Sequence, residues 1–367
     1  MKINFDYQVF CSQEYGGISR YFFEIANKLK NNYKQDVTVI SPLYINNYLK
    51  GEFNYFNLIG IPFRPIPKTG RIIRGLNSLL AKPLLAYSKP DIVHETYYSD
   101  RRSTPRGSKT IVTVHDMIHE KFSDQFPARD KTSHKKKLAI QRADHVICVS
   151  ENTRRDLIEL FDVKPENTSV VYHGFTLNHK GGGIKADSFN RPFLLYVGVR
   201  NGYKNFDTLL QAYASSFVLK NNFDLVCFGG GPFSDNEHLL MQKYKLASGR
   251  VRQVSGNDTL LATCYRSASV FVYPSLYEGF GIPPLEAMSF NCPVVCSNVS
   301  SIPEVVGEGA EMFDPYQLDS MRTAIERVVS DSDLRSELIA KGQERIKLFS
   351  WLQCAKETLD VYLKVLS

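Results

Sequence analysis

Short apolar runs rich in β-branched residues alternate with amphipathic stretches along the whole chain, and this alternation restricts the fold more than any other feature. The first half contains such runs at residues 2–10, 36–41, 91–95, 110–116, 145–150 and 169–174. The second half contains them at residues 193–199, 224–231, 251–256, 269–275 and 293–298. Helical patterns lie between them, for example at 18–30, 206–217 and 319–330. Apolar strands separated by helices are typical of parallel sheets covered on both faces, so the sequence predicts an α/β fold with two Rossmann-like, doubly wound domains.

A glycine-rich stretch divides the two sets of strands. At 367 residues the chain is longer than a single core usually grows. Residues 174–190 contain three consecutive glycines and little periodicity, which favours a hinge linker. We therefore expect an N-terminal domain over 1–173 and a C-terminal domain over 191–348. The amphipathic segment 349–367 is expected to form a helix that returns to the N-terminal domain.

Positive charge is concentrated in the first half of the chain. Residues 1–180 carry 27 Lys and Arg against 18 Asp and Glu, whereas residues 181–367 carry 18 against 20. This surplus indicates an anionic partner such as phosphate or an acidic lipid, and no motif for reading nucleic acid accompanies it. The seven cysteines are scattered without zinc-ligand spacing, and no signal-peptide pattern or apolar run of about 20 residues occurs. We therefore expect a cytoplasmic protein without a membrane-spanning helix.

Residues 277–288 read YEGFGIPPLEAM and directly follow a predicted strand. Ligands of open parallel sheets bind beyond the carboxyl ends of the strands, so this turn is a candidate binding site. Gly279 and Gly281 let backbone N–H groups approach an anion, and the two prolines suit the first turn of a helix whose positive end points the same way. Glu278 and Glu286 do not belong beside bare phosphate, so we expect both to accept hydrogen bonds from hydroxyl groups. A diphosphate flanked by hydroxyls indicates a sugar nucleotide.

Two cations follow the first strand of the second half. Arg200 and Lys204 can both neutralise a phosphate at this sheet edge, Arg as a planar fork and Lys as a point charge. The alternative is that both are engaged in ordinary salt bridges.

The second half resembles the E-x7-E region of the family-four retaining glycosyltransferases in two segments, YPSLYEGFGIPPLEAM and PVVCSNVSSIPEVVGEGA. The phosphate-binding segment of that family is similar to VGVRNGYKNFDTLLQAYA. The first half is similar to the family in EYGGISRYFFEIANKL, TVHDMIHEKF and ICVSENTRRDL. The resemblance covers nearly the whole chain. It implies the GT-B arrangement, in which two Rossmann-like domains face a central cleft, the first binding the acceptor and the second the nucleotide sugar.

The resemblance also implies a role for each matching residue. Glu278 would bind hydroxyls of the donor sugar and Glu286 the ribose. Arg200 and Lys204 would stabilise the departing diphosphate, although three residues separate them where many members have four. His115 matches the active-site histidine that contacts the donor sugar and the reaction centre. The other donor-binding residues would be Gly16 and Gly17 of a glycine loop, the amides of Gly279, Phe280 and Gly281, and the base-binding stretch 254–261 with Gly256.

The implied activity is the transfer of a hexose from a nucleotide-diphosphate sugar with retention of configuration. The stretches HDMIHEKF and GVRNGYKNF look closest to members that use GDP-mannose, so mannose is the favoured sugar. We identify no metal-binding aspartate pair and expect no metal and no cofactor besides the co-substrate. Similar transferases build O-antigen, capsule or other surface polysaccharide, including lipopolysaccharide, so we expect a glycan acceptor linked to a lipid diphosphate.

Other enzymatic interpretations fit less well. The stretch 115–119 reads HDMIH, which has the spacing of zinc-protease ligands, but it follows an apolar strand and has Asp in place of the catalytic Glu. His119 is then expected to be structural or to lie on the acceptor side. No GxGxxG or Walker motif supports an oxidoreductase or an NTPase. A sugar-nucleotide epimerase or a phosphorylase on the same two-domain plan stays open as the alternative.

A basic amphipathic segment in the first half has two interpretations. Residues 71–85 place several apolar side chains on one predicted helical face, with Arg71, Arg74 and Lys82 beside it. The apolar residues are Ile72, Ile73, Leu76, Leu79, Leu80 and Leu84. This face either packs on its own domain or lies in a membrane interface. The second interpretation predicts a peripheral enzyme on the cytoplasmic face of an anionic inner membrane.

Overall fold

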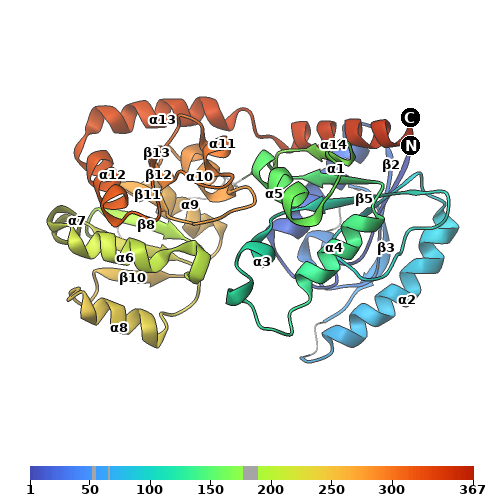
Figure 1. Cartoon of the computed structure of the whole chain (residues 1–367), viewed down its shortest axis with the longest axis horizontal. Helices are drawn as coiled ribbons and strands as arrows, with labels where there is room; N and C mark the ends of the chain where they lie inside the picture. Colours follow the sequence, from blue (N-terminus) through green and yellow to red (C-terminus); the bar gives the residue numbers. More distant parts are fainter. Residues whose placement is uncertain (52–54, 65–66, 177–188) are drawn as a thin grey trace. The chain divides into compact units, whose positions relative to one another are not determined.

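The computed structural model describes residues 1–51, 55–64, 67–176 and 189–367 (Figure 1). The chain divides into two compact units. Unit 1 consists of Met1–Gly174 together with Ser350–Ser367, and unit 2 consists of Phe175–Phe349. Most of the expected linker at 174–190 lies outside the described residues.

Unit 1 is built on a sheet whose described strands are all parallel, in the order β3-β2-β1-β4-β5-β6-β7. Its strands are β1 (Lys2–Phe5), β2 (Asp36–Tyr44), β3 (Asn57–Pro62), β4 (Ile92–Glu95), β5 (Lys109–Val114), β6 (His145–Cys148) and β7 (Thr168–Val170). Its helices are α1 (Gly17–Asn31), α2 (Gly70–Ser88), α3 (Ile118–Lys121), α4 (Thr132–Arg142), α5 (Glu151–Phe161) and α14 (Trp351–Leu366).

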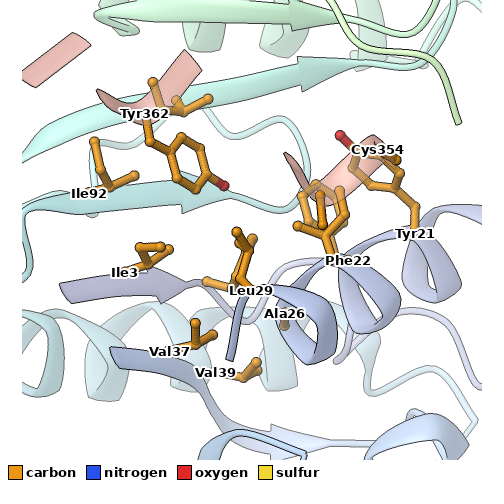
Figure 2. Close-up of a cluster of buried hydrophobic side chains, with 14 of the residues drawn as sticks. Ile3, Tyr21, Phe22, Ala26, Leu29, Val37, Val39, Ile92, Cys354 and Tyr362 are labelled. Carbon is orange, nitrogen blue, oxygen red and sulfur yellow. The ribbon is translucent and has the colours of Figure 1, made fainter. Parts of the chain in front are cut away.

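The helices α1 and α14 lie side by side on one face of this sheet, where they build the main core of unit 1 (Figure 2). Alternate strand residues such as Val37 and Val39 point into this core, as the period of two in a strand requires. The His94 imidazole on β4 binds the Tyr362 hydroxyl of α14 through Nδ1 at 2.6 Å. This contact between residues far apart in sequence makes α14 an integral part of unit 1.

The helix α2 covers the opposite face through a small and partly polar stripe. Its buried residues are Asn77, Ala81 and Leu85. The Asn77 amide donates to the carbonyl oxygen of Leu43 at 3.0 Å and accepts the Leu43 N–H at 2.8 Å, which anchors the helix to β2. Of the predicted apolar face, Leu84 packs against this part of the domain, whereas the others that are exposed, Ile72, Leu76, Leu79 and Leu80, do not.

Unit 2 is built on a second parallel sheet, in the order β10-β9-β8-β11-β12-β13. Its strands are β8 (Phe193–Val197), β9 (Asp224–Phe228), β10 (Val251–Val254), β11 (Val270–Tyr273), β12 (Val294–Ser297) and β13 (Glu311–Phe313). Its helices are α6 (Phe206–Ser215), α7 (Phe217–Asn222), α8 (Asp235–Lys243), α9 (Asp258–Ser267), α10 (Ile282–Ser289), α11 (Ile302–Val306), α12 (Leu318–Ser330) and α13 (Ser332–Ile346). One main core lies under α6 and α12.

Both sheets have the strand order of a doubly wound fold, so the predicted fold class of two Rossmann-like parallel-sheet domains is confirmed. In such sheets the direction of winding reverses beside the first strand, and ligands bind at that switch point, beyond the carboxyl ends of the strands. The switch points are β1/β4 in unit 1 and β8/β11 in unit 2. These two places are where functional side chains are expected.

Candidate active site

The predicted glycine turn of unit 2 leads from β11 into α10, and its last residue needs to be glycine. Gly281 is the N-terminal cap of α10 and has φ 100°, a left-handed conformation that residues with a side chain rarely adopt. Prolines occupy the first turn of the helix, and no side chain caps its N-terminus. Pro283 and Pro284 have no N–H, so the N–H groups that an anion could reach at this end are those of Gly281 and Ile282, where the helix dipole also favours negative charge.

Two serines at the start of α11 fix the same turn. The backbone N–H of Glu278 donates to the Ser300 hydroxyl at 2.9 Å. The Ser301 hydroxyl lies 2.9 Å from the carbonyl oxygens of both Glu278 and Phe280. The backbone that carries Glu278 and Gly279 is thus held rigidly before any ligand arrives.

Lys204 and Glu278 meet across the switch point of unit 2. The Lys204 ammonium lies 2.7 Å from the Glu278 carboxylate, with the two side chains only 17% and 10% exposed. Lys204 ends the short 3₁₀ turn Gly202–Lys204 that follows β8, whereas Glu278 follows β11. The pair brings a cation to the loop that leads into α10. The structure therefore places both Lys204 and Glu278 at one edge of the sheet.

A tyrosine from β11 completes this group. The Tyr273 hydroxyl hydrogen-bonds to Glu278, and the pKa of Tyr273 is raised well above its usual value, first by burial and then by the Glu278 charge. The Lys204 ammonium also lies 5.8 Å from the centre of the Tyr273 ring. Tyr273 therefore stays protonated and helps to orient both charged side chains. Its role was missed because its position in an apolar strand indicates only a core residue.

The Arg200 side chain makes more hydrogen bonds within unit 2 than the sequence indicated. Its Nε donates to Glu237, and its other N–H groups donate to the carbonyl oxygens of Gly229, Gly231 and Pro232 at 2.9–3.0 Å. Burial would raise the pKa of Glu237, but the hydrogen bonds from Arg200 and Ser234 lower it. Arg200 therefore fixes the loop between β9 and α8, in addition to the diphosphate-binding role that the family resemblance implies.

That loop contains three consecutive glycines in the left-handed region. Gly229, Gly230 and Gly231 have φ values of 85°, 69° and 72°. A Cβ atom on Gly230 would lie 2.6 Å from Nη1 of Arg200 and 2.9 Å from the carbonyl oxygen of Gly198. The backbone must approach the Arg200 guanidinium this closely, so only glycine fits there.

The two remaining predicted donor-binding residues of unit 2 lie on neighbouring elements. Glu286 is in the second half of α10, half-buried, and accepts a hydrogen bond from the Tyr265 hydroxyl at 3.2 Å. Gly256 follows β10, and a Cβ atom there would lie 2.6 Å from the Leu260 side chain of α9. The space near Gly256 is therefore narrow, because the predicted base-binding stretch 254–261 packs closely on itself there.

In unit 1, His115 directly follows β5 and is 9% exposed. Its ring stacks on His173 with the ring centres 5.6 Å apart, and Tyr21 meets it edge-on at 5.1 Å. Within the described residues, Nε2 of His115 has no hydrogen-bond partner. Burial, helped by His94 and Lys136, lowers the pKa of His115 to about 3. The imidazole is therefore neutral near pH 7 and a weak base.

The other predicted residues of unit 1 lie at the start of α1. Gly16 is the N-terminal cap of this helix, and no side chain caps it. A Cβ on Gly16 would meet only the flexible end of Gln13, and one on Gly17 would meet nothing within 4 Å. The glycine loop is thus open at Gly17, whereas the Gln13 side chain lies against Gly16 and accepts the Ser19 N–H in the first turn of α1 at 3.3 Å.

The structure also bears on the metal interpretations. The described part of the chain contains no group of three or more His, Cys, Asp or Glu side chains placed to hold a metal ion. His119 stacks on Phe126 with ring centres 4.0 Å apart, so it has a structural contact. One Asp-x-Asp pair does occur, Asp331 and Asp333, and the Asp331 carboxylate caps α13 by accepting the N–H of Asp333 at 3.0 Å.

Comparison with known proteins covers both units. The family model described as "Glycosyltransferase Family 4" matches residues 15–179, and the one described as "Glycosyl transferases group 1" matches residues 185–345. The O-antigen chain mannosyltransferase B of Escherichia coli is 29% identical, over 70% of this chain and 71% of its own length. The serotype-specific mannosyltransferase WbdA of Escherichia coli is 27% identical over 70% of this chain, and the match spans 34% of that longer relative. A solved structure of sucrose-phosphate synthase from Thermosynechococcus elongatus has a TM-score of 0.78 at 22% identity, covering 100% of this chain and 99% of its own.

Proposed function

Because the chain belongs to the family-four glycosyltransferases, we propose that it transfers a hexose, with mannose favoured, from a nucleoside-diphosphate sugar to a glycan acceptor with retention of configuration. The observation that carries this proposal is the Lys204–Glu278 pair beside the uncapped N-terminus of α10. A cation and free N–H groups suit a diphosphate, and a neighbouring carboxylate suits sugar hydroxyls.

The charges explain how such a site would accelerate transfer. Negative charge builds on the diphosphate as the bond between the sugar and the phosphate oxygen breaks. Lys204 and the N–H groups at Gly281 and the start of α10 are already oriented by the surrounding hydrogen bonds, so they stabilise that charge without reorganisation. Removing one preorganised donor of this kind commonly lowers kcat by about 10²–10³.

Retention is supported by the environment of His115. Attack with inversion needs a general base that deprotonates the acceptor hydroxyl, and a base works best when its pKa lies near the working pH. The pKa of His115 is lowered to about 3 by burial, which leaves it poorly suited to that task. In the proposed reaction the departing phosphate takes the acceptor proton, and His115 contacts the sugar as a neutral hydrogen-bonding group.

The proposal extends to the acceptor and the site of action. Two relatives named above are an O-antigen chain mannosyltransferase and a serotype-specific mannosyltransferase, which favours a surface-polysaccharide glycan and GDP-mannose. No helix in the described part of the chain is long and apolar enough to cross a membrane. The exposed apolar face of α2 beside Arg71 and Arg74 supports contact with an anionic membrane surface, where a lipid-linked acceptor would reside.

A panel of GDP, UDP, dTDP and ADP sugars tests the proposal by calorimetry and by turnover. The expected result is tight binding of the GDP sugar and transfer of labelled mannose only when a glycan acceptor is added, with the α-linkage of the donor kept in the product. The Lys204→Gln variant should lose turnover, whereas Lys220→Gln on the exposed surface of unit 2 should not. Turnover of the sugar nucleotide without acceptor would instead indicate an epimerase, and failure of every nucleoside diphosphate to bind would refute the assignment.

A further inference from the structure

Unit 1 contains a cavity of about 880 Å³ that the predicted site residues do not line. It lies at the β1/β4 switch point, because its walls include residues 7, 8 and 12 after β1 and residues 97–101 after β4. The first turns of α2 and the start of α4 close the other sides. A doubly wound sheet binds ligands at this position, so the cavity is where a ligand of unit 1 is expected.

The cavity is strongly cationic. Six basic side chains and two acidic ones line it. The basic residues are Arg71, Arg74, Arg101, Arg129, Lys131 and Lys135, and the acidic ones are Asp100 and Asp130. The Asp130 carboxylate accepts the N–H of Thr132 at 2.7 Å and lies 4.0 Å from Nε2 of His119. Within the described residues, none of the six basic side chains forms an ion pair with a carboxylate, so their charge is available to an anion.

Neutral hydrogen-bond donors stand among these cations. Burial raises the pKa of both Tyr7 and Tyr97 to about 12, so their phenol groups stay protonated at neutral pH. The cavity is also lined by residues 129–132, which lead into the N-terminus of the eleven-residue helix α4. Cations and phenols together provide donors that phosphate groups prefer, whereas the first N–H of α4, that of Thr132, is already bound to Asp130.

One cavity residue contacts His115, which the family resemblance places at the reaction centre. Tyr98 lines the cavity, and its hydroxyl accepts the backbone N–H of His115 at 3.3 Å. An anion bound in the cavity would thus lie one side chain away from the histidine that the family resemblance places beside the transferred sugar. The ligand of this cavity is therefore expected to be the acceptor rather than a remote effector.

The helix α2 joins this cavity to an apolar surface. Arg71 and Arg74 line the cavity, whereas Ile72 and Leu79 are 64% and 71% exposed on another side of the same helix. Leu76 and Leu80 are exposed beside them. The helix contains basic residues but no Asp or Glu. Its exposed face thus has the chemistry of a lipid contact, and it is continuous with a cavity that has the chemistry of a phosphate site.

We propose that this cavity binds the phosphate or diphosphate group of a lipid-linked acceptor, whose apolar chain lies on the exposed face of α2 at the membrane surface. The inference rests on the proposed transferase function and names its acceptor class. It assigns the six basic side chains to the acceptor head group, separately from the donor site of unit 2. Phosphate recognition by partly exposed cations depends on salt, so the binding should weaken as ionic strength rises.

Inorganic pyrophosphate tests the head-group site by calorimetry. The Lys204→Gln variant is used as the background, because it removes one of the two cations, Lys204 and Arg200, that the family resemblance assigns to the donor site in unit 2. Adding Arg74→Gln and Arg129→Gln should weaken pyrophosphate binding about tenfold. Adding Arg106→Gln and Lys164→Gln, two exposed cations of unit 1 outside the cavity, should leave it unchanged. Equal pyrophosphate affinity of these two triple variants, each lacking three positive charges, would overturn the site.

Vesicles test whether the anion belongs to a lipid. Phosphatidylcholine vesicles containing a polyprenyl diphosphate are sedimented with the full-length protein. The double variant Ile72→Ser and Leu79→Ser should bind them about tenfold more weakly and keep its affinity for soluble pyrophosphate. Vesicle binding equal to that of the unmodified protein would overturn the lipid assignment. These measurements need no sugar nucleotide, so failure of the donor panel would be recognised separately.

Discussion

Arg200 and Glu237 form a buried ion pair, with Nε and Oε1 2.5 Å apart and the side chains 3% and 9% exposed. The bond to Glu237 and the bonds to three backbone carbonyl oxygens together engage four of the five N–H groups of Arg200. The cation that the family resemblance assigns to the diphosphate thus also fixes its own loop. In the proposed reaction a phosphate would reach Arg200 through the remaining N–H group or by displacing Glu237.

Paired variants separate these two tasks. We expect Arg200→Gln to lower kcat by about 10²–10³, because it removes a preorganised donor to the diphosphate. Glu237→Gln keeps Arg200 and a neutral hydrogen bond to it. Its loss of kcat should therefore be about tenfold smaller than that of Arg200→Gln, while its free energy of unfolding falls by about 1–3 kcal/mol. Steady-state kinetics and urea unfolding measure both. Equal losses of kcat in the two variants would mean that Arg200 acts only by holding the loop.

Glu286 and His115 should affect different constants. Glu286→Ala is expected to raise the donor Kd about tenfold, because ribose hydroxyls lose a charged acceptor. Glu286→Gln preserves the contact with Tyr265 and serves as the milder control. His115→Ala should lower kcat about a hundredfold with little change in donor Kd. Calorimetry with the nucleoside diphosphate and turnover assays distinguish the two, and an identical profile for both variants would contradict the assigned roles.

The triple-glycine loop offers a matched pair of substitutions. Gly230→Ala places a methyl group 2.6 Å from the Arg200 guanidinium, so Arg200 must move and turnover should fall at least about tenfold. Gly231→Ala carries the same left-handed φ but meets nothing within 4 Å, so it should cost only about 1 kcal/mol of backbone strain. Similar turnover in the two proteins would show that the position of Arg200 does not matter for catalysis.

Acid should destabilise unit 1 through its buried histidines. Burial lowers the pKa of His94 to about 3, whereas an unfolded histidine titrates near 6.5, so the unfolded chain binds more protons between these values. Stability from this group is present above about pH 6.5 and is lost as the pH falls toward 3. Between about pH 7.5 and about pH 5 the loss is about 2 kcal/mol.

A difference measurement isolates this effect. Glu95 acts in the opposite sense, because burial raises its pKa to about 7 and the folded state then gains stability on acidification. This contribution is common to the unmodified protein and to His94→Gln. The stability deficit of His94→Gln should therefore shrink by about 2 kcal/mol over the same interval, measured by urea unfolding. His134→Gln at the surface is the control, and a deficit independent of pH would contradict the prediction.

Metal removal gives a simple prediction for the chemistry. The positive charge proposed for the leaving group comes from Lys204, Arg200 and N–H groups, so dialysis against EDTA should leave kcat within about twofold. Restoration of lost activity by Mg²⁺ or Mn²⁺ would instead show that a divalent cation shares this task.

The parts that depend on local pattern could be predicted from the sequence. Alternating strands and helices indicated both sheets, and the glycines and prolines around Gly281 indicated a helix that begins at a sheet edge. Glu237 was missed as the partner of Arg200, although the Ser234 capping box that contains it was visible, because pairing across 37 residues depends on the folded loop. Ser300 and Ser301 were missed for the same reason.

The helix α2 shows a different limit of sequence reasoning. Its leucines and isoleucines suggested which face would matter, but Asn77, Ala81 and Leu85 make the contact with the sheet. Small residues and one amide permit close approach to β2, and hydrophobicity alone does not identify such a face. The cavity beside it combines residues from distant loops, so only the individual basic runs could be seen in advance.

The C-terminal helix has a consequence for biosynthesis. Trp351–Leu366 supplies Trp351, Cys354 and Tyr362 to a core otherwise made by the first 174 residues. A growing polypeptide releases that segment from the ribosome only after all of unit 2 has emerged. The core of unit 1 therefore stays incomplete until unit 2 has been synthesised. Unit 1 cannot finish folding first, in contrast to the usual N-terminal-first order of co-translational folding.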